Sequence, residues 1–259
     1  MSVLRKYIFR RNSTTLSQII EGGSSPTPII IDGIEYNLVT NPITGKTWLD
    51  KDLGVTQVPT SLDYCSNAEA HLYQWGRSND GHQIRTSAVR AVKSTTDTPG
   101  HGDFIGFPYN DKNPSADIDW RSTQNDNLWQ GVNGINLPLG TPEGFRLPTA
   151  SEWQAEIDSW SSPTIYGAFD SPLKLVMTNS RSSSGGINSS AYVNDCTDGV
   201  WWSSTVMYYP PDPSYNISKA LLIYNRPSPV DGNNGAVVSQ ITRAQGAAVR
   251  LILDDAYVN

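Results

Sequence analysis

The stretch GFRLPTASEW, residues 144–153, gives the clearest structural signal in the chain. Thr149 followed three positions later by Glu152 is the pattern of a capping box, in which each side chain binds the other residue's backbone N–H at a helix start. Pro148 and Trp153 stand at the positions of a hydrophobic staple. The stretch therefore predicts a turn, a short extended segment and a firmly capped helix.

The helix that follows is expected to be amphipathic. Trp153, Ile157 and Trp160 recur at the spacing that places side chains on one helix face. Ser162-Pro163 is expected to end the helix, because the residue before a proline avoids the helical conformation. We interpret the segment as scaffold that fastens a helix to a sheet, and we do not expect it to act in catalysis.

The composition indicates a loop-rich globular chain. Its 259 residues suffice for one large domain or two small ones. Only 17% of the residues are charged, whereas Trp (8), Tyr (12), Gly (21) and Pro (17) are plentiful. A core built from a few large aromatic side chains fits this composition. The predicted core tryptophans are Trp48, Trp75, Trp153, Trp201 and Trp202.

Charge and hydropathy exclude several classes of partner. The formal net charge is −6, and because no basic stripe with interleaved aromatics occurs, nucleic-acid binding is not expected. No apolar run is long enough to cross a bilayer, so membrane insertion is not expected either. The basic N-terminus lacks the apolar region of a signal peptide, so export by that route is not expected. Cys65 and Cys196 are too distant for a CxxC motif, and two buried thiols or a disulfide are the alternatives.

The first 28 residues differ in character from the rest. Residues 1–21 are basic with a short apolar pattern, and we predict that they form a docking or oligomerisation arm. Residues 22–28, GGSSPTP, read as a linker that is first flexible and then stiff. A disordered tail is the alternative. The arm residues expected to make contacts are Arg5, Tyr7, Ile8, Phe9 and Arg10.

Strands are predicted directly after the linker. Residues 29–31 and 34–39 flank Asp32-Gly33, a dipeptide typical of tight hairpin turns. Residues 41–45 indicate another turn and residues 47–50 another strand. Three strands in close succession predict an antiparallel meander.

The middle of the chain is predicted to contain one helix and a long irregular segment. Leu62, Ala68, Leu72 and Trp75 predict a helix over residues 60–76. Patterning then fades over residues 81–143, which isolated aromatic anchors, Trp120 and Trp129, are expected to hold. Strands are predicted again at residues 200–205, 220–224, 236–238 and 247–253. This order indicates an α+β domain with antiparallel sheet over residues 29–259.

Motifs for catalysis are missing from the sequence. There is no Gly-x-Ser-x-Gly nucleophile motif and no glycine-rich phosphate loop. The acidic pairs at residues 117 and 119 and at residues 254 and 255 are expected to be solvated charges rather than a cation site. The histidines share no metal-ligand spacing and are expected to be structural: His71, His82 and His101. We therefore expect no catalytic residue, metal or cofactor.

Binding is the chemistry that the sequence favours. Tyrosine gives large contact area at low cost in conformational entropy and asparagine gives adaptable hydrogen bonds, as in antibody paratopes. Both gather in the loops between the last strands, although an ordinary solvated loop has the same composition. The candidate ligand-binding residues are Tyr208, Tyr209, Tyr215, Asn216, Asn225, Arg226, Asn233 and Asn234.

Five segments stand in a fixed order along the chain: TGKTWLD (44–50), LYQWGR (72–77), GFRLPT with the following Glu-Trp (144–153), WSST (202–205) and AVR (248–250). In this order they resemble the C-type-lectin-fold proteins of the formylglycine-generating-enzyme-like (sulfatase-modifying-factor-like) superfamily. The pattern is most similar to the phage and prophage tail-fibre branch and to the related major paralogous domain of gut and rumen bacteria. The resemblance covers roughly residues 29–254.

The resemblance implies a C-type-lectin-like fold with a small antiparallel sheet, two helices and long irregular loops. It also implies loops that display binding surfaces at phage fibre tips and that retroelements diversify in some relatives. The formylglycine-generating enzymes bind copper through nearby cysteines, and no cysteine follows Cys196. Sugar-binding C-type lectins ligate calcium through Glu-Pro-Asn or Gln-Pro-Asp, and neither triplet occurs. Oxidation and calcium-dependent sugar binding are therefore not expected.

These observations together favour a non-enzymatic phage protein that is made in the host cytoplasm and carried on the virion. Its arm is expected to bind other virion proteins, and its head to bind a bacterial surface glycan or protein. A homotrimer is expected by analogy with other fibres, because several copies make weak sites effective. The alternatives are a capsid or tail decoration protein, a formylglycine-generating-type oxidase and a bacterial surface binding domain.

Overall fold

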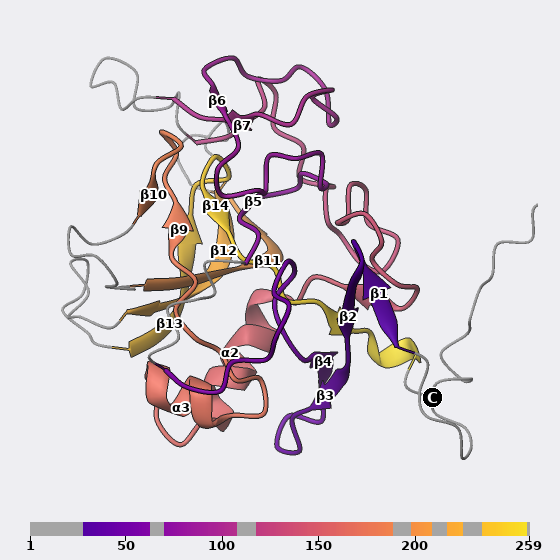
Figure 1. The fold of residues 1–259 in the computed structure, drawn as a ribbon, viewed down its shortest axis with the longest axis vertical. Coiled ribbons are helices and arrows are strands. Elements are labelled where there is room, and N and C mark those ends of the chain that lie inside the picture. Colours follow the sequence, from indigo (N-terminus) through magenta and orange to yellow (C-terminus); the bar gives the residue numbers. More distant parts are fainter. Residues whose placement is uncertain are drawn as a thin grey trace, which may run out of the picture.

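A computed structural model describes residues 28–62, 70–107, 118–188, 198–208, 217–224 and 235–257. These residues form several small, mostly antiparallel sheets and two α-helices, which confirms the α+β class (Figure 1). Within them, no helix is long and apolar enough to span a bilayer. The arm at residues 1–21, most of the linker and both cysteines lie outside the described residues.

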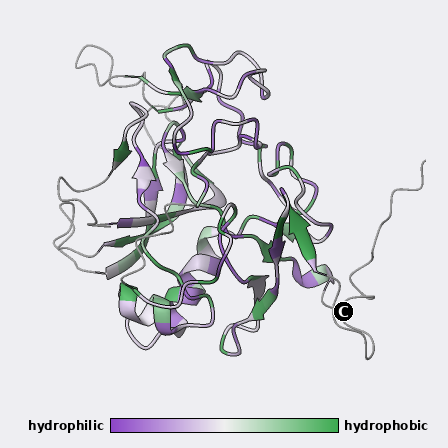
Figure 2. Cartoon of the chain, viewed as in Figure 1, coloured by the Kyte–Doolittle hydropathy of each residue, from purple (hydrophilic) through white to green (hydrophobic). Residues whose placement is uncertain are grey.

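The N-terminal hairpin forms as predicted. β1 (Ile29–Ile31) pairs with β2 (Ile34–Tyr36), with Ile31 opposite Ile34. Asp32 and Gly33 have φ angles of 50° and 78°, the left-handed conformation that a tight hairpin turn requires. The three consecutive isoleucines make β1 the green strand at the right of Figure 2.

The predicted meander is wrong, because the two halves of the segment at residues 34–40 pair in different sheets. β3 (Leu38–Thr40) pairs with β4 (Thr47–Leu49) in a different sheet from β1 and β2. Asn37 separates β2 from β3; its backbone carbonyl accepts from the Asp50 N–H at 2.9 Å. The predicted strand over residues 34–39 is therefore two short strands that serve two sheets.

The sheet that holds β3 and β4 also contains segments from the middle and the end of the chain. Its order is β3-β4-β15-β8, with β15 at Ile252–Leu253 and β8 at Phe145–Arg146. β8 is the extended segment predicted before the helix, and α2 (Ala150–Ser159) follows it. The same short stretch therefore joins the end of the chain to α2.

The capping box of α2 is confirmed. The Glu152 N–H donates to Thr149 Oγ1 at 3.2 Å, and the Thr149 N–H donates to Glu152 Oε2 at 2.7 Å. Trp153 and Ile157 are buried as the helical spacing predicts, but the helix ends at Ser159, before the predicted stop. Trp160 caps it in an extended conformation, and the chain turns into α3 (Ile165–Asp170).

The helix predicted over residues 60–76 is wrong over its second half. Residues 63–69 lie outside the described residues, and Tyr73–Gln74 form strand β5, which pairs with β14 (Gly246–Ala247). Leu72, Tyr73 and Trp75 are all buried, so the apolar positions are not confined to one helical face. An indole N–H group stabilises the extended conformation of this segment, because Trp202 Nε1 donates to the Tyr73 carbonyl at 2.6 Å.

Three longer strands complete the fold and extend the predicted ones. β11 (Asp198–Met207), β12 (Ile217–Tyr224) and β13 (Gly235–Ile241) form an antiparallel sheet in the order β11-β12-β13. α2 packs against all three strands. The remaining short elements are β6 (Val89–Arg90), β7 (Phe104–Ile105), β9 (Ser180–Arg181), β10 (Ile187–Asn188) and a 3-10 helix at Asp255–Tyr257.

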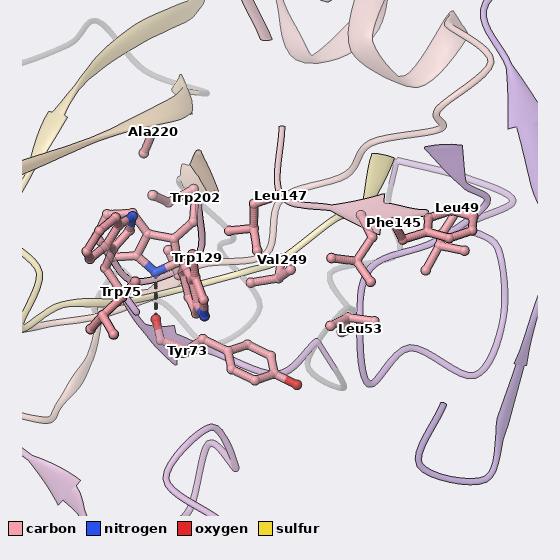
Figure 3. Packing of buried hydrophobic residues seen from close by; sticks show 14 of the residues in the cluster. Leu49, Leu53, Tyr73, Trp75, Trp129, Phe145, Leu147, Trp202, Ala220 and Val249 are labelled. Atoms are coloured by element: carbon pink, nitrogen blue, oxygen red, sulfur yellow. Dashed lines mark hydrogen bonds between the residues drawn. The ribbon is translucent and has the colours of Figure 1, made fainter. Parts of the chain in front are cut away.

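Aromatic side chains build the core in two clusters. All five predicted core tryptophans are buried, and so are Trp120 and Trp129, which anchor the irregular segment. In one cluster Trp75, Trp129 and Trp202 gather beside Tyr73 and Val249 (Figure 3). In the other, Trp48 of β4 stacks on Trp153 of α2 with ring centroids 4.8 Å apart. The core prediction is therefore confirmed.

Candidate functional site

Tyr208 is the predicted ligand-binding residue that the structure describes. It directly follows β11, and 62% of its surface is exposed. The other seven candidates lie outside the described residues: Tyr209, Tyr215, Asn216, Asn225, Arg226, Asn233 and Asn234. The predicted arm contacts also lie outside them: Arg5, Tyr7, Ile8, Phe9 and Arg10.

The strand register separates the places where the two candidate loops attach. Met207 lies opposite Ile217 at one end of the sheet, whereas Tyr224 lies opposite Asp198 and Gly235 at the other. The eight residues of β12 lie between these ends, a distance of roughly 25 Å at strand spacing. The loop that begins with Tyr208 and the loop that follows Tyr224 therefore leave opposite ends, and we treat them as two groups.

α2 runs between these two ends of the sheet. Near its N-terminus, the Ala150 N–H donates to Thr205 Oγ1 of β11 at 2.9 Å. Past its C-terminus, the Pro163 carbonyl accepts from the Ala236 N–H of β13 at 2.7 Å. The Tyr208 end thus lies beside the start of α2, and the Tyr224 end lies beside the connection between α2 and α3.

At the C-terminal end of α2 the structure forms a half-open cleft of about 190 Å³. The turn after β3 forms one wall, and the end of α2 with α3 forms the other. The lining residues are Asn41, Pro42, Ile43, Ser159, Trp160, Ser161, Gly167, Asp170, Ser171 and Pro172. No sequence pattern predicts this cleft, because its two walls are more than 110 positions apart in the chain.

A buried hydrogen-bond network fixes the wall formed by the turn. Asn41 Nδ2 donates to Glu156 Oε2 at 2.7 Å and to Ser159 Oγ at 2.8 Å, while Asn41 Oδ1 accepts from the Ile43 N–H at 2.9 Å. Thr44 Oγ1 donates to Glu156 Oε1 at 2.7 Å. The turn is therefore tied to α2 by side chains whose hydrogen bonds are already made, and the cleft is preformed.

Glu156 is a buried carboxylate that receives only neutral donors in this network. Besides Asn41 and Thr44, Trp48 donates from Nε1 to Glu156 Oε1 at 3.2 Å. Burial raises the pKa of Glu156, and the hydrogen bonds from these three residues only partly offset the effect. The group is shielded behind the wall of the cleft and has a structural role there.

The groups that a ligand in the cleft could contact are exposed side chains, not the buried Glu156. Ile43 stands out with 73% of its surface exposed, and Pro42 beside it is also exposed. The Asp170 side chain is exposed and makes no hydrogen bond or ion pair with the described residues, and the hydroxyl-bearing Ser161 is exposed as well. Tyr166 is exposed on the same side of α3 as Asp170, one turn earlier.

The three histidines take different environments. His82 is fully buried: its Nε2 accepts from the Gln74 N–H at 3.0 Å, so Nδ1 carries the proton that bonds Asp80 Oδ1 at 2.7 Å. His101 Nδ1 accepts from the Asp103 N–H at 3.2 Å. His71 Nδ1 is buried and has no hydrogen-bond partner among the described residues, which omit the nearby stretch 63–69. Among the described residues, no group of three acidic, histidine or cysteine side chains could hold a metal ion.

Sequence patterns missed the buried arginines that hold the irregular segments. Arg77 donates to the carbonyls of His101 and Asp103 at 2.9 and 3.0 Å. Arg181 donates to the carbonyls of Gly185 and Ser87, both at 2.7 Å. Burial lowers the pKa of Arg181 to about 10, so the group stays charged at neutral pH. The irregular segments are therefore held by hydrogen bonds from buried guanidinium groups to backbone carbonyls, where few strand pairings are present.

Comparison with protein-family models, with curated proteins and with solved structures gives no significant match. A proposal of function therefore draws on the exposed end of β11 and on the resemblance carried by the five sequence segments.

Proposed function

We propose that this protein is a non-enzymatic binding protein of a phage virion, a fibre or adhesin whose N-terminal arm attaches to the particle. Its head displays loops to the bacterial surface. The virion location rests on the sequence resemblance. The binding role rests on a contrast: the residues of the five segments are buried in the scaffold, whereas a predicted binding residue is exposed where a loop begins.

One observation carries the binding role. The characteristic residues of the five segments are buried and structural, including Trp48, Trp75, Trp153, Trp202 and Arg250. Tyr208, by contrast, is exposed at the end of a ten-residue strand that this scaffold holds. Binding residues are expected on loops that a rigid scaffold positions, because sequence changes there leave the core intact.

Each head is expected to bind weakly, and we propose that several copies on one particle act together. Linked sites gain avidity without any new contact, because the second binding event becomes intramolecular. A homotrimer is the assembly proposed here, by analogy with other fibres. The partner is a glycan or protein of the bacterial surface.

Two experiments test the proposal. Mass spectrometry of purified virions checks whether the protein is part of the particle, and deletion of residues 1–21 checks whether the arm attaches it. Particles that keep the truncated protein would rule out the arm as anchor. Tyr208→Ser is then expected to reduce adsorption to host cells, whereas Leu139→Ser, which alters a comparably exposed apolar residue elsewhere, is expected to leave adsorption unchanged.

A further deletion distinguishes the alternative of a capsid or tail decoration protein. In that case the arm would still be needed for incorporation into the virion. Deletion of the whole head, residues 29–259, would then leave adsorption to host cells unchanged.

A further inference from the structure

We propose that the cleft between the turn at residues 41–43 and the corner of α2 and α3 binds one neutral sugar residue without a metal ion. The site is separate from Tyr208, which lies at the opposite end of α2. It lies instead on the side where β12 ends and β13 begins, because Ala236 of β13 binds the Pro163 carbonyl in the connection between the two helices.

The size of the cleft limits the ligand to a small group. Sites for drug-sized molecules enclose about 300 to 1,000 Å³, whereas this cleft encloses about 190 Å³. It therefore admits one ring or one side chain, with the rest of a larger ligand extending into solvent. Such a site suits a terminal or branching residue of a surface polysaccharide.

The lining groups select for a ligand with both polar and apolar faces. Ile43 and Pro42 offer an exposed apolar rim, on which the C–H face of a sugar ring can pack. The Asp170 carboxylate accepts hydrogen bonds only, while the Ser161 hydroxyl both donates and accepts. A ring bearing several hydroxyl groups can contact all of these at once.

Charge and hydrogen-bonding capacity argue against the other small ligands. The lining residues include one acid and no base, so an anionic sugar, a phosphate or a carboxylate would meet repulsion. A lysine or arginine side chain of a peptide would pair with Asp170, but it carries donors only and leaves the apolar rim without a matching face. A neutral sugar is the ligand class that matches every wall.

Preorganisation of the turn favours binding at a single-residue site. The buried Asn41 side chain holds the turn through three hydrogen bonds, to Glu156, Ser159 and Ile43. A rigid wall avoids the entropy cost of ordering a loop on binding. Affinity for one residue is expected in the millimolar range, which several copies on a particle would raise through avidity.

Binding of methyl glycosides to the purified full chain tests this proposal without host cells or virions. The probes are the methyl glycosides of glucose, galactose, mannose, rhamnose and N-acetylglucosamine, followed by saturation-transfer NMR in the presence of a chelator. At least one is expected to bind. Asp170→Ala and Ile43→Ser are each expected to weaken that binding about tenfold or more, because one removes a charged acceptor and the other the apolar rim.

Asp158→Ala is the matched control, because Asp158 is also an exposed acid, lies on α2 and does not line the cleft. It is expected to leave binding unchanged, and circular dichroism checks that each variant is folded. Failure of every glycoside to bind, or binding that the cleft variants do not change, would overturn the proposal. Binding of N-acetyl-lysine methylamide in place of the glycosides would also overturn it and would identify a peptide site. None of these outcomes bears on the arm or on Tyr208, so the proposed function stands or falls separately.

Discussion

Arg250 donates from Nε to Asp52 Oδ1 at 2.7 Å, and both side chains are essentially excluded from solvent, with exposures of 1% and 0%. Trp201 Nε1 donates to the other oxygen of the same carboxylate at 3.0 Å. Arg250 also donates to the carbonyls of Leu49 and Leu173, both at 3.1 Å. One ion pair thus joins four chain segments, including the segment just before the last strand and the segment just after β4.

Breaking this pair is expected to destabilise the fold strongly. Arg250→Leu leaves the Asp52 carboxylate buried without its cation, and such a change typically costs about 3–5 kcal/mol. Urea unfolding measures the loss. Arg90→Ala is the control, because Arg90 and Asp103 pair at 3.0 Å with the arginine 50% exposed, and exposed pairs contribute at most about 1 kcal/mol. Equal losses in the two variants would contradict a structural role for the buried pair.

His82 is expected to make stability depend on pH in the mildly acidic range. Burial lowers the pKa of His82 to about 4; Asp80 opposes this shift, and Arg77 and Arg181 add to it. The unfolded chain, with an ordinary value near 6.5, binds more protons between the two values. This contribution to the free energy of unfolding is therefore complete above pH 6.5 and is lost as the pH falls towards 4.

The slope can be assigned to His82 with one variant. Each unit of pKa difference corresponds to about 1.4 kcal/mol, so the free energy of unfolding is expected to fall by roughly that amount per pH unit below 6.5. His82→Gln keeps a donor and an acceptor but cannot titrate, and it should remove this component. Urea titrations at several pH values check the result, and an unchanged slope in the variant would place the titrating group elsewhere.

Local patterns of a few residues were predictable, and long-range partners were not. The capping box involves Thr149 and Glu152, which are three positions apart, so the sequence contains the whole signal. The Asp32-Gly33 turn is equally local. By contrast, Tyr73–Gln74 form a strand because Gly246–Ala247 pair with them from the other end of the chain. Helical spacing among the apolar residues of that segment therefore predicted the wrong element.

In the candidate site, too, local features could be predicted from the sequence and long-range contacts could not. Tyrosine-rich loops between the last strands could be found from composition, but the register that places them at opposite ends of β12 could not. The cleft depends on Asn41 reaching Glu156, two polar residues without a motif between them. The buried ion pair of Arg250 could be anticipated in part, because a single arginine inside the apolar run at residues 247–253 needs a buried partner.

Gly76 is expected to tolerate no side chain. Its φ angle is +80°, and a Cβ atom would lie 2.6 Å from Leu128 Cδ1 and 2.8 Å from Leu128 Cβ in the core. Gly76→Ala therefore combines the left-handed conformation, at about 1–2 kcal/mol, with overpacking, at about 1–3 kcal/mol. Gly45→Ala is the matched control, because Gly45 has a φ of +70° and nothing within 4 Å of its Cβ position. Thermal unfolding should rank Gly76→Ala clearly below the control, and equal midpoints would argue against the close approach of Leu128.

The capping box makes a separate pH-dependent contribution through Glu152. Its carboxylate binds Arg146 in a fork, Oε1 with Nη2 at 2.7 Å and Oε2 with Nη1 at 2.9 Å, and it also accepts from the Thr149 N–H. Burial opposes the charge, but the hydrogen bonds from Arg146 and Thr149 outweigh burial and lower the pKa of Glu152 from its ordinary value of 4.5. The contribution is therefore present above pH 4.5 and is lost as the pH falls through the lowered pKa.

Glu152→Gln keeps the shape of the side chain and removes its charge. At neutral pH it is expected to lower the free energy of unfolding by about 1.5–3 kcal/mol, the range for a hydrogen bond to a charged group. Thr149→Ala removes the Oγ1 atom that accepts from the Glu152 N–H and donates to Glu152 Oε2 at 3.0 Å. It leaves Glu152 charged and should cost about 1 kcal/mol at neutral pH. Urea unfolding of both variants from neutral to acid pH separates the two terms. The difference in free energy of unfolding between wild type and Glu152→Gln must narrow as the wild-type carboxylate takes up its proton. A difference that stays constant down to acid pH would mean that the charge of this carboxylate does not stabilise the folded protein.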